Sequence, residues 1–217
     1  MKTSKKLFIA FFVFLVLIII SFSYPGKDYF KKIKNESIQN FETINFQKIK
    51  YLKIEKDCTI QLSQSENEKP YFFYIDYKDS VNIKPVYIFS GDTLVVKSTK
   101  SSYRNGMWLN CQKIQGFIVH GHLELFNGQK DVDAVIKNGR LTLQGNNYQN
   151  LNIKIDNGSA VYWGKGLKHV NAHLNKGKLE IENTILKDVT IDARNKSRIR
   201  LKANNMVSHC DNSSRFY

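Results

Sequence analysis

Cysteine is scarce in this chain of 217 residues, which contains three of them, far apart in the sequence. Cys58, Cys111 and Cys210 form no CxxC pair and stand at no Cys/His spacing typical of a metal site. An odd number of widely spaced cysteines indicates neither a disulfide framework nor a zinc site. We therefore expect no metal and no cofactor.

Acidic residues are also few, with 19 Asp and Glu against 33 Lys and Arg, so the formal net charge is +14. Setting residues 1–24 aside leaves 30 basic and 19 acidic residues, a net charge of about +11. A charge of this sign favours acidic partners such as anionic lipid, lipopolysaccharide, acidic glycan or nucleic acid. A lysine-rich solvated surface has the same composition, so net charge alone identifies no partner.

Charge is absent altogether from Leu7 to Tyr24, a run that three lysines precede. At 1.5 Å per residue this stretch would reach about 27 Å, close to one hydrocarbon core, so residues 1–24 are predicted to form a membrane-spanning signal anchor. The alternative is a signal peptide cut after the small residues Ser21 and Ser23. The length of the apolar run favours the anchor. The chain would then be a single-pass membrane protein facing the periplasm or exterior, or otherwise a secreted one.

A repeat of about 19 residues dominates the second half of the chain. Four copies start at Val132, Leu151, Val170 and Val189, and they read VDAVIKNGRLTLQG, LNIKIDNGSAVYWG, VNAHLNKGKLEIEN and VTIDARNKSRIRLKA. A further copy, IQGFIVHGHLELFN, starts at Ile114. Each copy alternates apolar and polar residues, breaks near an Asn-Gly pair or its equivalent, and then alternates again, which predicts a strand, a corner and a second strand.

Stacking the copies predicts inward columns of apolar side chains. They contain Ile136, Ile155 and Leu174; Leu141, Ala160, Leu179 and Ile199; Leu143, Tyr162, Ile181 and Leu201; and, at a corner, Tyr148, Leu167, Leu186 and Met206. Between the strands stand Gly121, Gly139, Gly158 and Gly177, with Ser197 in the last copy. We expect these glycines to supply the positive φ that a sharp corner needs.

Asn-Gly between alternating strands is also a hairpin signal, so an antiparallel meander has to be considered. The fixed period favours parallel stacking, because nothing in a meander forces identical columns at constant spacing. The sequence therefore predicts an all-β protein, a single-stranded parallel β-helix over residues 41–207. A linker or capping segment (25–40) would precede it, and a polar tail (208–217) would follow. We expect residues 97–113 to form a polar surface loop.

The arrangement resembles the auto-transporter adhesin head GIN domain family of Gram-negative envelopes. The resemblance covers residues 41–206 and is carried by FQKIKYLKIEKDCTIQLSQ from Phe46, by YFFYIDYKDSVNIKPVYIFSGDTLVVK from Tyr71, and by the glycine-cornered rungs that follow. It implies a right-handed parallel β-helix that is exported and has no established activity. The many lysines and asparagines, and a leader without a lipoprotein cysteine, depart from the family pattern.

Two sets of outward residues are candidate ligand contacts. The first is a basic column just after the corner, in which Ser159 is the uncharged interruption: His122, Arg140, Lys178 and Arg198. Like charges on neighbouring rungs about 4.8 Å apart would act together on an anion. The second set is aromatic, with Phe126 and Trp163 in one outward column, and Trp108 and Tyr103 in the expected loop. Cross-strand stacking that stabilises the sheet is the alternative role for these rings.

The other polar residues give weaker signals. Histidines 120, 122, 169 and 173 fall in columns of solvated residues, which does not favour a metal site. Paired carboxylates would be needed for glycan cleavage, and the candidates are Asp131, Asp133, Asp156, Glu180, Glu182 and Asp192. Cationic residues on the next rung favour a surface charge ladder instead.

The sequence thus predicts a non-enzymatic envelope module with a structural or adhesive role. Its partners would be anionic glycan, lipopolysaccharide or lipid surfaces, or an envelope protein; a nucleic acid is not expected. The alternative is a glycan-active β-helix lyase or hydrolase.

Overall fold

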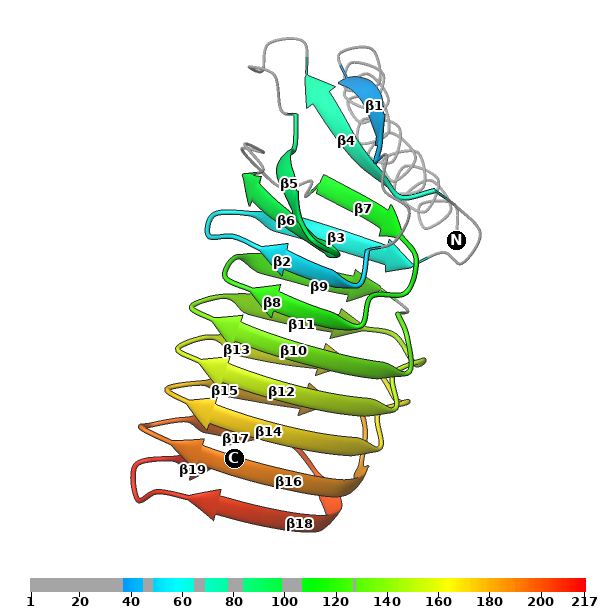
Figure 1. Ribbon diagram of the computed structural model, residues 1–217. Coiled ribbons are helices and arrows are strands. Elements are labelled where there is room, and N and C mark those ends of the chain that lie inside the picture. The colour runs from blue at the N-terminus through cyan, green and yellow to red at the C-terminus, as the bar shows by residue number, and fades with distance from the viewer. Residues whose placement is uncertain (1–36, 45–48, 65–68, 78–83, 99–106, 127) are drawn as a thin grey trace, which may run out of the picture. The chain divides into compact units, whose positions relative to one another are not determined.

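The computed structural model describes residues 37–44, 49–64, 69–77, 84–98, 107–126 and 128–217 (Figure 1). By its contacts the chain divides into two compact units, one of Met1–Gln39 and Ile75–Val81 and the other of Asn40–Tyr74 and Asn82–Tyr217. The larger unit is an all-β solenoid. None of the described residues belongs to a helix that could cross a membrane, and the predicted N-terminal anchor lies outside them.

Two sheets form the solenoid. In spatial order, sheet A consists of β1 (Ser37–Thr43), β4 (Tyr71–Tyr77), β7 (Met107–Cys111), β3 (Thr59–Gln64), β9 (His122–Phe126), β11 (Arg140–Gln144), β13 (Ser159–Trp163), β15 (Lys178–Glu182), β17 (Arg198–Arg200) and β19 (Arg215–Phe216). Sheet B consists of β18 (Ala203–Cys210), β16 (Leu186–Arg194), β14 (His169–Asn175), β12 (Asn150–Asp156), β10 (Asp131–Lys137), β8 (Gly116–Val119), β2 (Tyr51–Ile54), β6 (Thr93–Ser98) and β5 (Val86–Ser90).

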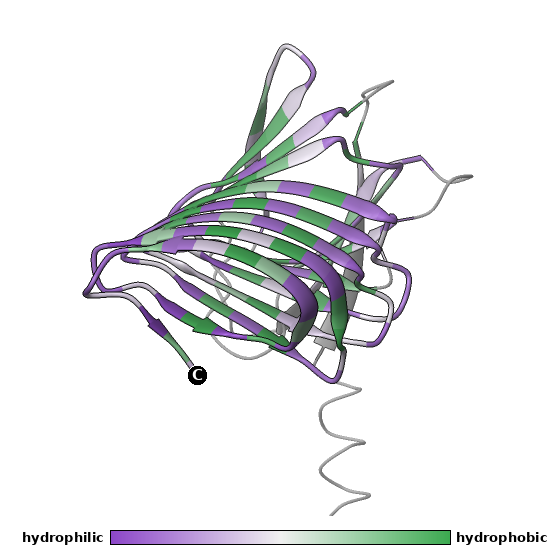
Figure 2. Ribbon diagram, turned by 90° about the horizontal axis from the view of Figure 1, so that it is seen from below, coloured by the Kyte–Doolittle hydropathy of each residue, from purple (hydrophilic) through white to green (hydrophobic). Residues whose placement is uncertain are grey.

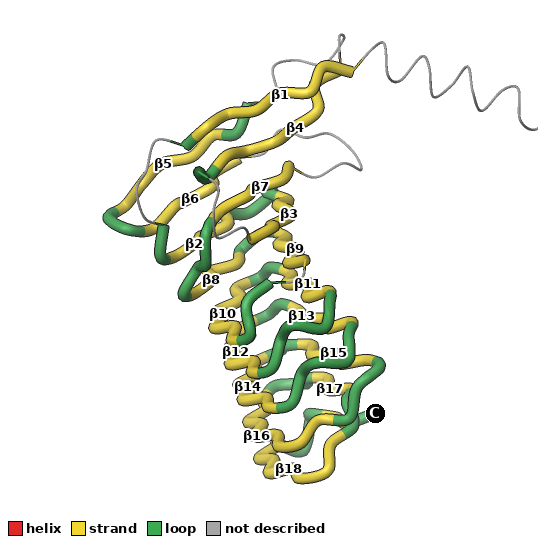
Figure 3. The backbone as a smooth tube through the Cα atoms, turned by 90° about the vertical axis from the view of Figure 1, so that its right-hand side faces the viewer, coloured by secondary structure: helices red, strands yellow, loops and turns green. Residues whose placement is uncertain are grey.

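The predicted parallel stacking of the repeats is confirmed. Each turn places one strand in sheet B and the next in sheet A, and a loop returns the chain to sheet B (Figure 3). Leu141, Ala160, Leu179 and Ile199 are in register and fully buried, as predicted. The column of Ile136, Ile155 and Leu174 is also confirmed and continues to Ala193. Figure 2 shows the alternation of apolar and polar residues along the strands.

The corner glycines do not have the positive φ that was predicted for them. At three of the corners the residue before the glycine has the positive φ: 60° at Asn138, 52° at Asn157 and 53° at Lys176. The glycines themselves are needed because stacked corners approach closely. A Cβ on Gly158 would lie 2.7 Å from the carbonyl oxygen of Gly139, closer than such atoms can approach. Asparagine tolerates the left-handed region better than most residues, which explains the Asn-Gly order.

The last corner differs because it contains one more residue. Asn195 and Lys196 both have positive φ, at 56° and 66°. Ser197 follows, and its buried Oγ donates a hydrogen bond to the Arg194 carbonyl at 2.6 Å and accepts one from the Gly177 amide at 3.2 Å. The extra residue makes room for a side chain where the other corners have glycine.

Three further expectations are corrected. Residues 97–113 are not simply a loop, because β7 lies within them and buries Met107 and Leu109. Met206 is not a corner residue; it is in register with Val189 in β18 and is 49% exposed, while Ala203 occupies the place opposite Leu186. Two pairings, β4 with β7 and β5 with β6, are antiparallel.

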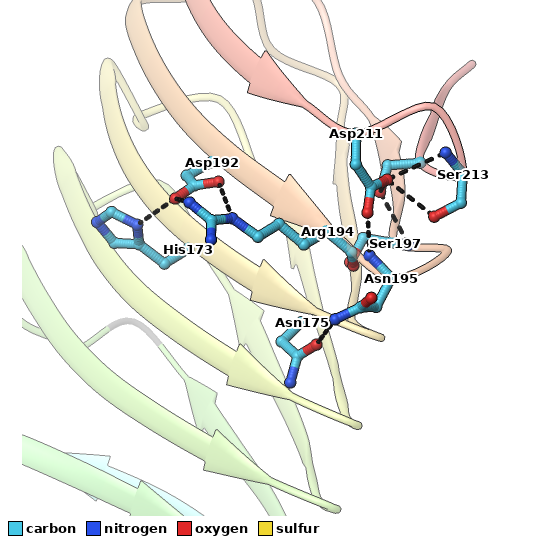
Figure 4. A network of polar contacts seen from close by, with 9 residues as sticks. His173, Asn175, Asp192, Arg194, Asn195, Ser197, Asp211 and Ser213 are labelled. Atoms are coloured by element: carbon cyan, nitrogen blue, oxygen red, sulfur yellow. Dashed lines mark hydrogen bonds and ion pairs between the residues drawn. The ribbon is translucent and has the colours of Figure 1, made fainter.

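The last ten residues, expected to form a polar tail, supply the end of β18 and all of β19. Arg215 is in register with Arg198, and Phe216 with Ile199. The final corner is held by the Asp211 carboxylate, which accepts hydrogen bonds from the Asn195 amide at 2.6 Å and the Ser213 hydroxyl at 2.8 Å (Figure 4). These bonds hold the pKa of Asp211 well below its usual range.

Candidate functional site

A column of outward cationic residues runs along sheet A. The strand register places its members side by side on β9, β11, β13, β15, β17 and β19, in the order His122, Arg140, Ser159, Lys178, Arg198 and Arg215. These are the basic residues singled out in the sequence, together with Arg215. Arg140, Lys178, Arg198 and Arg215 are all exposed. The structure therefore brings three cations, Lys178, Arg198 and Arg215, onto three consecutive strands.

Few acidic groups neutralise this column. Lys178 Nζ lies 2.9 Å from the Glu180 carboxylate, on its own strand. No ion pair joins Arg140, Arg198 or Arg215 to another residue that the structure describes. Arginine keeps its charge at any physiological pH, so these positions carry fixed positive charge.

His122, at the other end of the column, adds little charge at neutral pH. Its Nε2 lies 3.4 Å from the Glu124 carboxylate and 3.4 Å from Thr142 Oγ1. Burial lowers the pKa of His122, and nearby Arg140 lowers it further, against the opposing effect of Glu124. A neutral imidazole is therefore favoured at pH 7, and the cations that stand on consecutive strands of this column are those of β15, β17 and β19.

A surface depression of about 570 Å³ lies where the column crosses β15 and β17. Among the residues lining it are Lys178, Glu180, Arg198, Arg200 and Tyr217. Tyr217 is held in place by its amide, which donates to the Ile199 carbonyl at 2.9 Å. Arg200 Nη1 lies 3.7 Å from Glu182, a contact between exposed groups that contributes little binding energy. We call this feature, together with the adjoining Arg215, the cationic depression. Its charge and its aromatic wall suit an anionic group attached to an apolar ring.

The aromatic candidates lie on the same sheet but apart from the cationic column. Phe126, Gln144 and Trp163 are in register in one outward column, as predicted, and Trp163 is 40% exposed. Trp108 lies in β7 rather than in a loop, and its ring stacks on that of Phe126 with centroids 5.6 Å apart. Tyr103 lies outside the described residues. Four residues along a strand separate this column from the cationic one, about 13 Å, so one small ligand would not touch both.

The carboxylates and histidines form ladders between rungs. Asp131, Asp133 and Asp156 each accept a hydrogen bond from the asparagine in register on the next strand. Asp192 binds Arg194 and lies 3.8 Å from His173 (Figure 4). These contacts are typical of a stabilised surface. Glu180 and Glu182 each lie beside a cation, Lys178 at 2.9 Å and Arg200 at 3.7 Å. Within the same part of the chain, no group of three or more His, Cys, Asp or Glu residues could hold a metal.

Sequence reasoning missed Arg215 and Tyr217, although a signal was present. The final corner reads NSSRFY from Asn212, which aligns with NKSRIR from Asn195 and has Asn, Ser and Arg at the same places. The match was hidden because this last rung is shorter than the regular ones, although Arg215 is still the register partner of Arg198.

No family model matches the sequence, and no curated protein matches it either. Solved structures do resemble the fold. A crystal structure named "putative adhesin" from Bacteroides fragilis has a TM-score of 0.53 at 14% identity, covering 83% of this chain and 96% of that one. A "putative adhesin" from Parabacteroides merdae has a TM-score of 0.42 at 12% identity, covering 83% and 95%. A "Putative lipid binding protein" from Parabacteroides distasonis has 0.42 at 12%, covering 82% and 95%. At these identities the first likeness shows the fold alone.

Proposed function

We propose that this protein is a non-enzymatic envelope module that binds polyanionic surfaces, acidic glycan or lipopolysaccharide, through the cationic depression. One observation carries the proposal: Lys178, Arg198 and Arg215 occupy three consecutive strands in register, and the two arginines have no ion pair within the described residues. The membrane-anchoring leader, the right-handed sense of the helix and membership of the head GIN family belong to the same proposal. The fold likeness to a protein named as an adhesin supports it.

Repulsion between like charges makes such a column unfavourable unless an anion binds to it. Two unit charges about 5 Å apart repel by about 0.8 kcal/mol in water. Like charges directly opposite one another destabilise a sheet, so a purely structural column would tend to alternate in sign. The neighbouring ladders on sheet B do pair acid with amide or imidazole. The cationic column departs from that pattern, and an anionic ligand would remove the repulsion.

The test is a triple charge reversal, Lys178→Glu, Arg198→Glu and Arg215→Glu, in the full-length chain purified in a mild detergent. Binding to immobilised heparin and to immobilised lipopolysaccharide would be measured over a range of salt concentrations. The parent should bind both and lose affinity steeply with salt, because each contact is an exposed charge pair. The triple variant should lose this binding and still fold, with similar thermal unfolding, because three carboxylates in register repel one another about as three cations do.

A matched control separates the site from the net charge of the chain. Lys137, Lys168 and Lys187 are exposed and lie outside sheet A. Changing these three to Glu alters the net charge by the same amount but leaves the cationic depression intact. The control variant should keep most of the binding. If it loses as much as the column variant, or if the parent binds neither surface, the proposed function is refuted.

A further inference from the structure

A second surface depression, of about 320 Å³, lies on the outward face of sheet B. The residues that matter in its lining are Tyr51, Gly116, Ile118, Asp133, Val135 and Lys154. We call it the sheet B depression. Elsewhere on β10, β12 and β14 the outward residues are Asn, Asp, His and Lys, so the apolar side chains gathered here interrupt an otherwise polar face.

The floor of this depression is built by register. Tyr51, Gly116 and Asp133 are neighbours on successive strands, and Ile118 and Val135 are neighbours in the next outward column. A Cβ on Gly116 would lie 3.3 Å from Tyr51 Cδ1, so the tyrosine ring packs against the glycine backbone. Tyr51 is nevertheless 41% exposed. The result is a shallow apolar hollow, open to solvent, whose floor is made of one ring and two branched side chains.

The rim carries the carboxylate of Asp133 and the ammonium group of Lys154. Asp133 accepts a bond from the Asn152 amide at 2.9 Å, which leaves its other carboxylate oxygen available on the rim. Lys154 is exposed and takes part in no ion pair with a described residue. His173, beyond it, is 3.8 Å from Asp192. Neither Lys154 nor Asp133 forms an ion pair with a described residue, so the rim offers one cation and one carboxylate to a ligand.

Two classes of partner fit this surface poorly. A peptide that binds by strand addition needs a free backbone edge, whereas β2, β8 and β10 each have a strand paired on both sides. An acyl chain gains most of its binding energy from enclosure in an apolar cavity, and this surface is open and rimmed by charge. A sugar ring has one apolar C–H face and a perimeter of hydroxyls, which matches an exposed aromatic floor with polar neighbours.

We propose that the sheet B depression binds a pyranose ring that carries a carboxylate, as in a hexuronic acid residue of an acidic polysaccharide. The apolar face of the ring lies on Tyr51, Ile118 and Val135. The carboxylate pairs with Lys154, and a ring hydroxyl donates to Asp133. This site is separate from the cationic depression, and the inference goes beyond the proposed function by adding a second site whose ligand is a sugar acid.

The experiment uses saturation-transfer NMR on the full-length chain in mild detergent, with trigalacturonate as the acidic probe and maltotriose as the neutral one. Val135→Glu places a carboxylate on the floor and should weaken trigalacturonate binding by about tenfold. Lys154→Gln should weaken trigalacturonate by about tenfold and leave the weaker maltotriose signal unchanged. Thr190→Glu adds the same charge to an exposed outward position of β16 and serves as the matched control.

The outcomes separate this site from the cationic depression. Trigalacturonate binding that survives the Lys178, Arg198 and Arg215 triple variant but falls in Val135→Glu supports the proposal, even if heparin and lipopolysaccharide binding fail. Loss in the triple variant without loss in Val135→Glu overturns it, as does equal loss in Thr190→Glu or no binding by the parent. Contacts from detergent acyl protons to the Ile118 and Val135 methyl groups, without contacts from the sugar, would assign the depression to a lipid chain and also overturn it.

Discussion

The corner glycines allow a sharp test of why the solenoid needs them. At Gly158 the backbone does not have a positive φ, but a Cβ would lie 2.7 Å from both the Gly139 carbonyl oxygen and Ile136 Cγ2. At Gly91 the reverse holds, since φ is +61° and nothing lies within 4 Å of an added Cβ. Gly158 is therefore required by close packing, and Gly91 by backbone conformation.

The magnitudes follow from these two causes. Gly158→Ala forces stacked backbones apart, which should cost about 2 kcal/mol as overpacking does, and lower the melting temperature by about 4–8 °C. Gly158→Val should cost more. Gly91→Ala adds backbone strain alone, about 1 kcal/mol. Asparagine relieves that strain, so Gly91→Asn should be more stable than Gly91→Ala. At Gly158 asparagine should be no better than alanine, because its Cβ meets the same oxygen.

Thermal unfolding followed by circular dichroism would measure the four alanine and asparagine variants in one buffer. The decisive quantity is the difference between asparagine and alanine at each site, since this difference cancels any general effect of replacing glycine. If Gly158→Asn is more stable than Gly158→Ala by the margin found at Gly91, the corner glycine serves backbone conformation and the close-packing argument is wrong.

Two other predictions concern the ends of the chain. Asp211→Ala should speed hydrogen exchange at the Asn195 amide, because that amide donates to the carboxylate. Because the pKa of Asp211 is lowered, its stabilising contribution is fully present above a pH of about 4 and declines as the pH falls from there through the lowered pKa. The difference in thermal stability between parent and variant should therefore shrink steadily below that pH, and a difference that does not shrink would contradict the assignment. For residues 1–24, cell fractionation should find the uncut chain with membranes and resistant to salt washing, whereas a soluble form beginning near Tyr24 would show that the leader is a cleaved signal peptide.

The repeating part of the fold could be predicted because one physical requirement acts at every rung. Stacked rungs must present identical inward positions, so the constant period of the repeat determines which side chains are buried, as at Leu141 and Leu179. The same register determines the outward columns, and this is why the cationic column could be anticipated from sequence. The argument weakened where a rung changes length. Met206 was misplaced for that reason, and Arg215 was missed.

Residue type alone could not reveal the role of the corner glycines. Glycine is required either where φ is positive or where two backbone segments approach closely, and the sequence does not distinguish these two causes. The sheet B depression was hidden for a related reason. Gly116 is a glycine within a strand, and Tyr51 is an exposed ring on a strand much earlier in the chain. They form one surface only because β2 and β8 are neighbours.

The order of the rungs in space differs from their order in the chain, and Cys58 shows how the structure accommodates this. The rung formed by β2 and β3 lies between the rung of β6 and β7 and the rung of β8 and β9.

At the glycine corners of the later rungs, an added Cβ would meet atoms of the preceding rung. At Gly121, for example, it would meet the Cys58 carbonyl oxygen. Cys58 holds the glycine position of its own rung, and its buried Sγ lies 3.6 Å from the Val96 carbonyl. The Cys58 side chain is therefore accommodated beside the end of β6. A cysteine in place of glycine here coincides with an atypical neighbouring rung, whereas at Ser197 the neighbour is regular and an extra corner residue makes room. A local period cannot express this information, because the pairing of β2 with β6 and β8 is long-range in the chain.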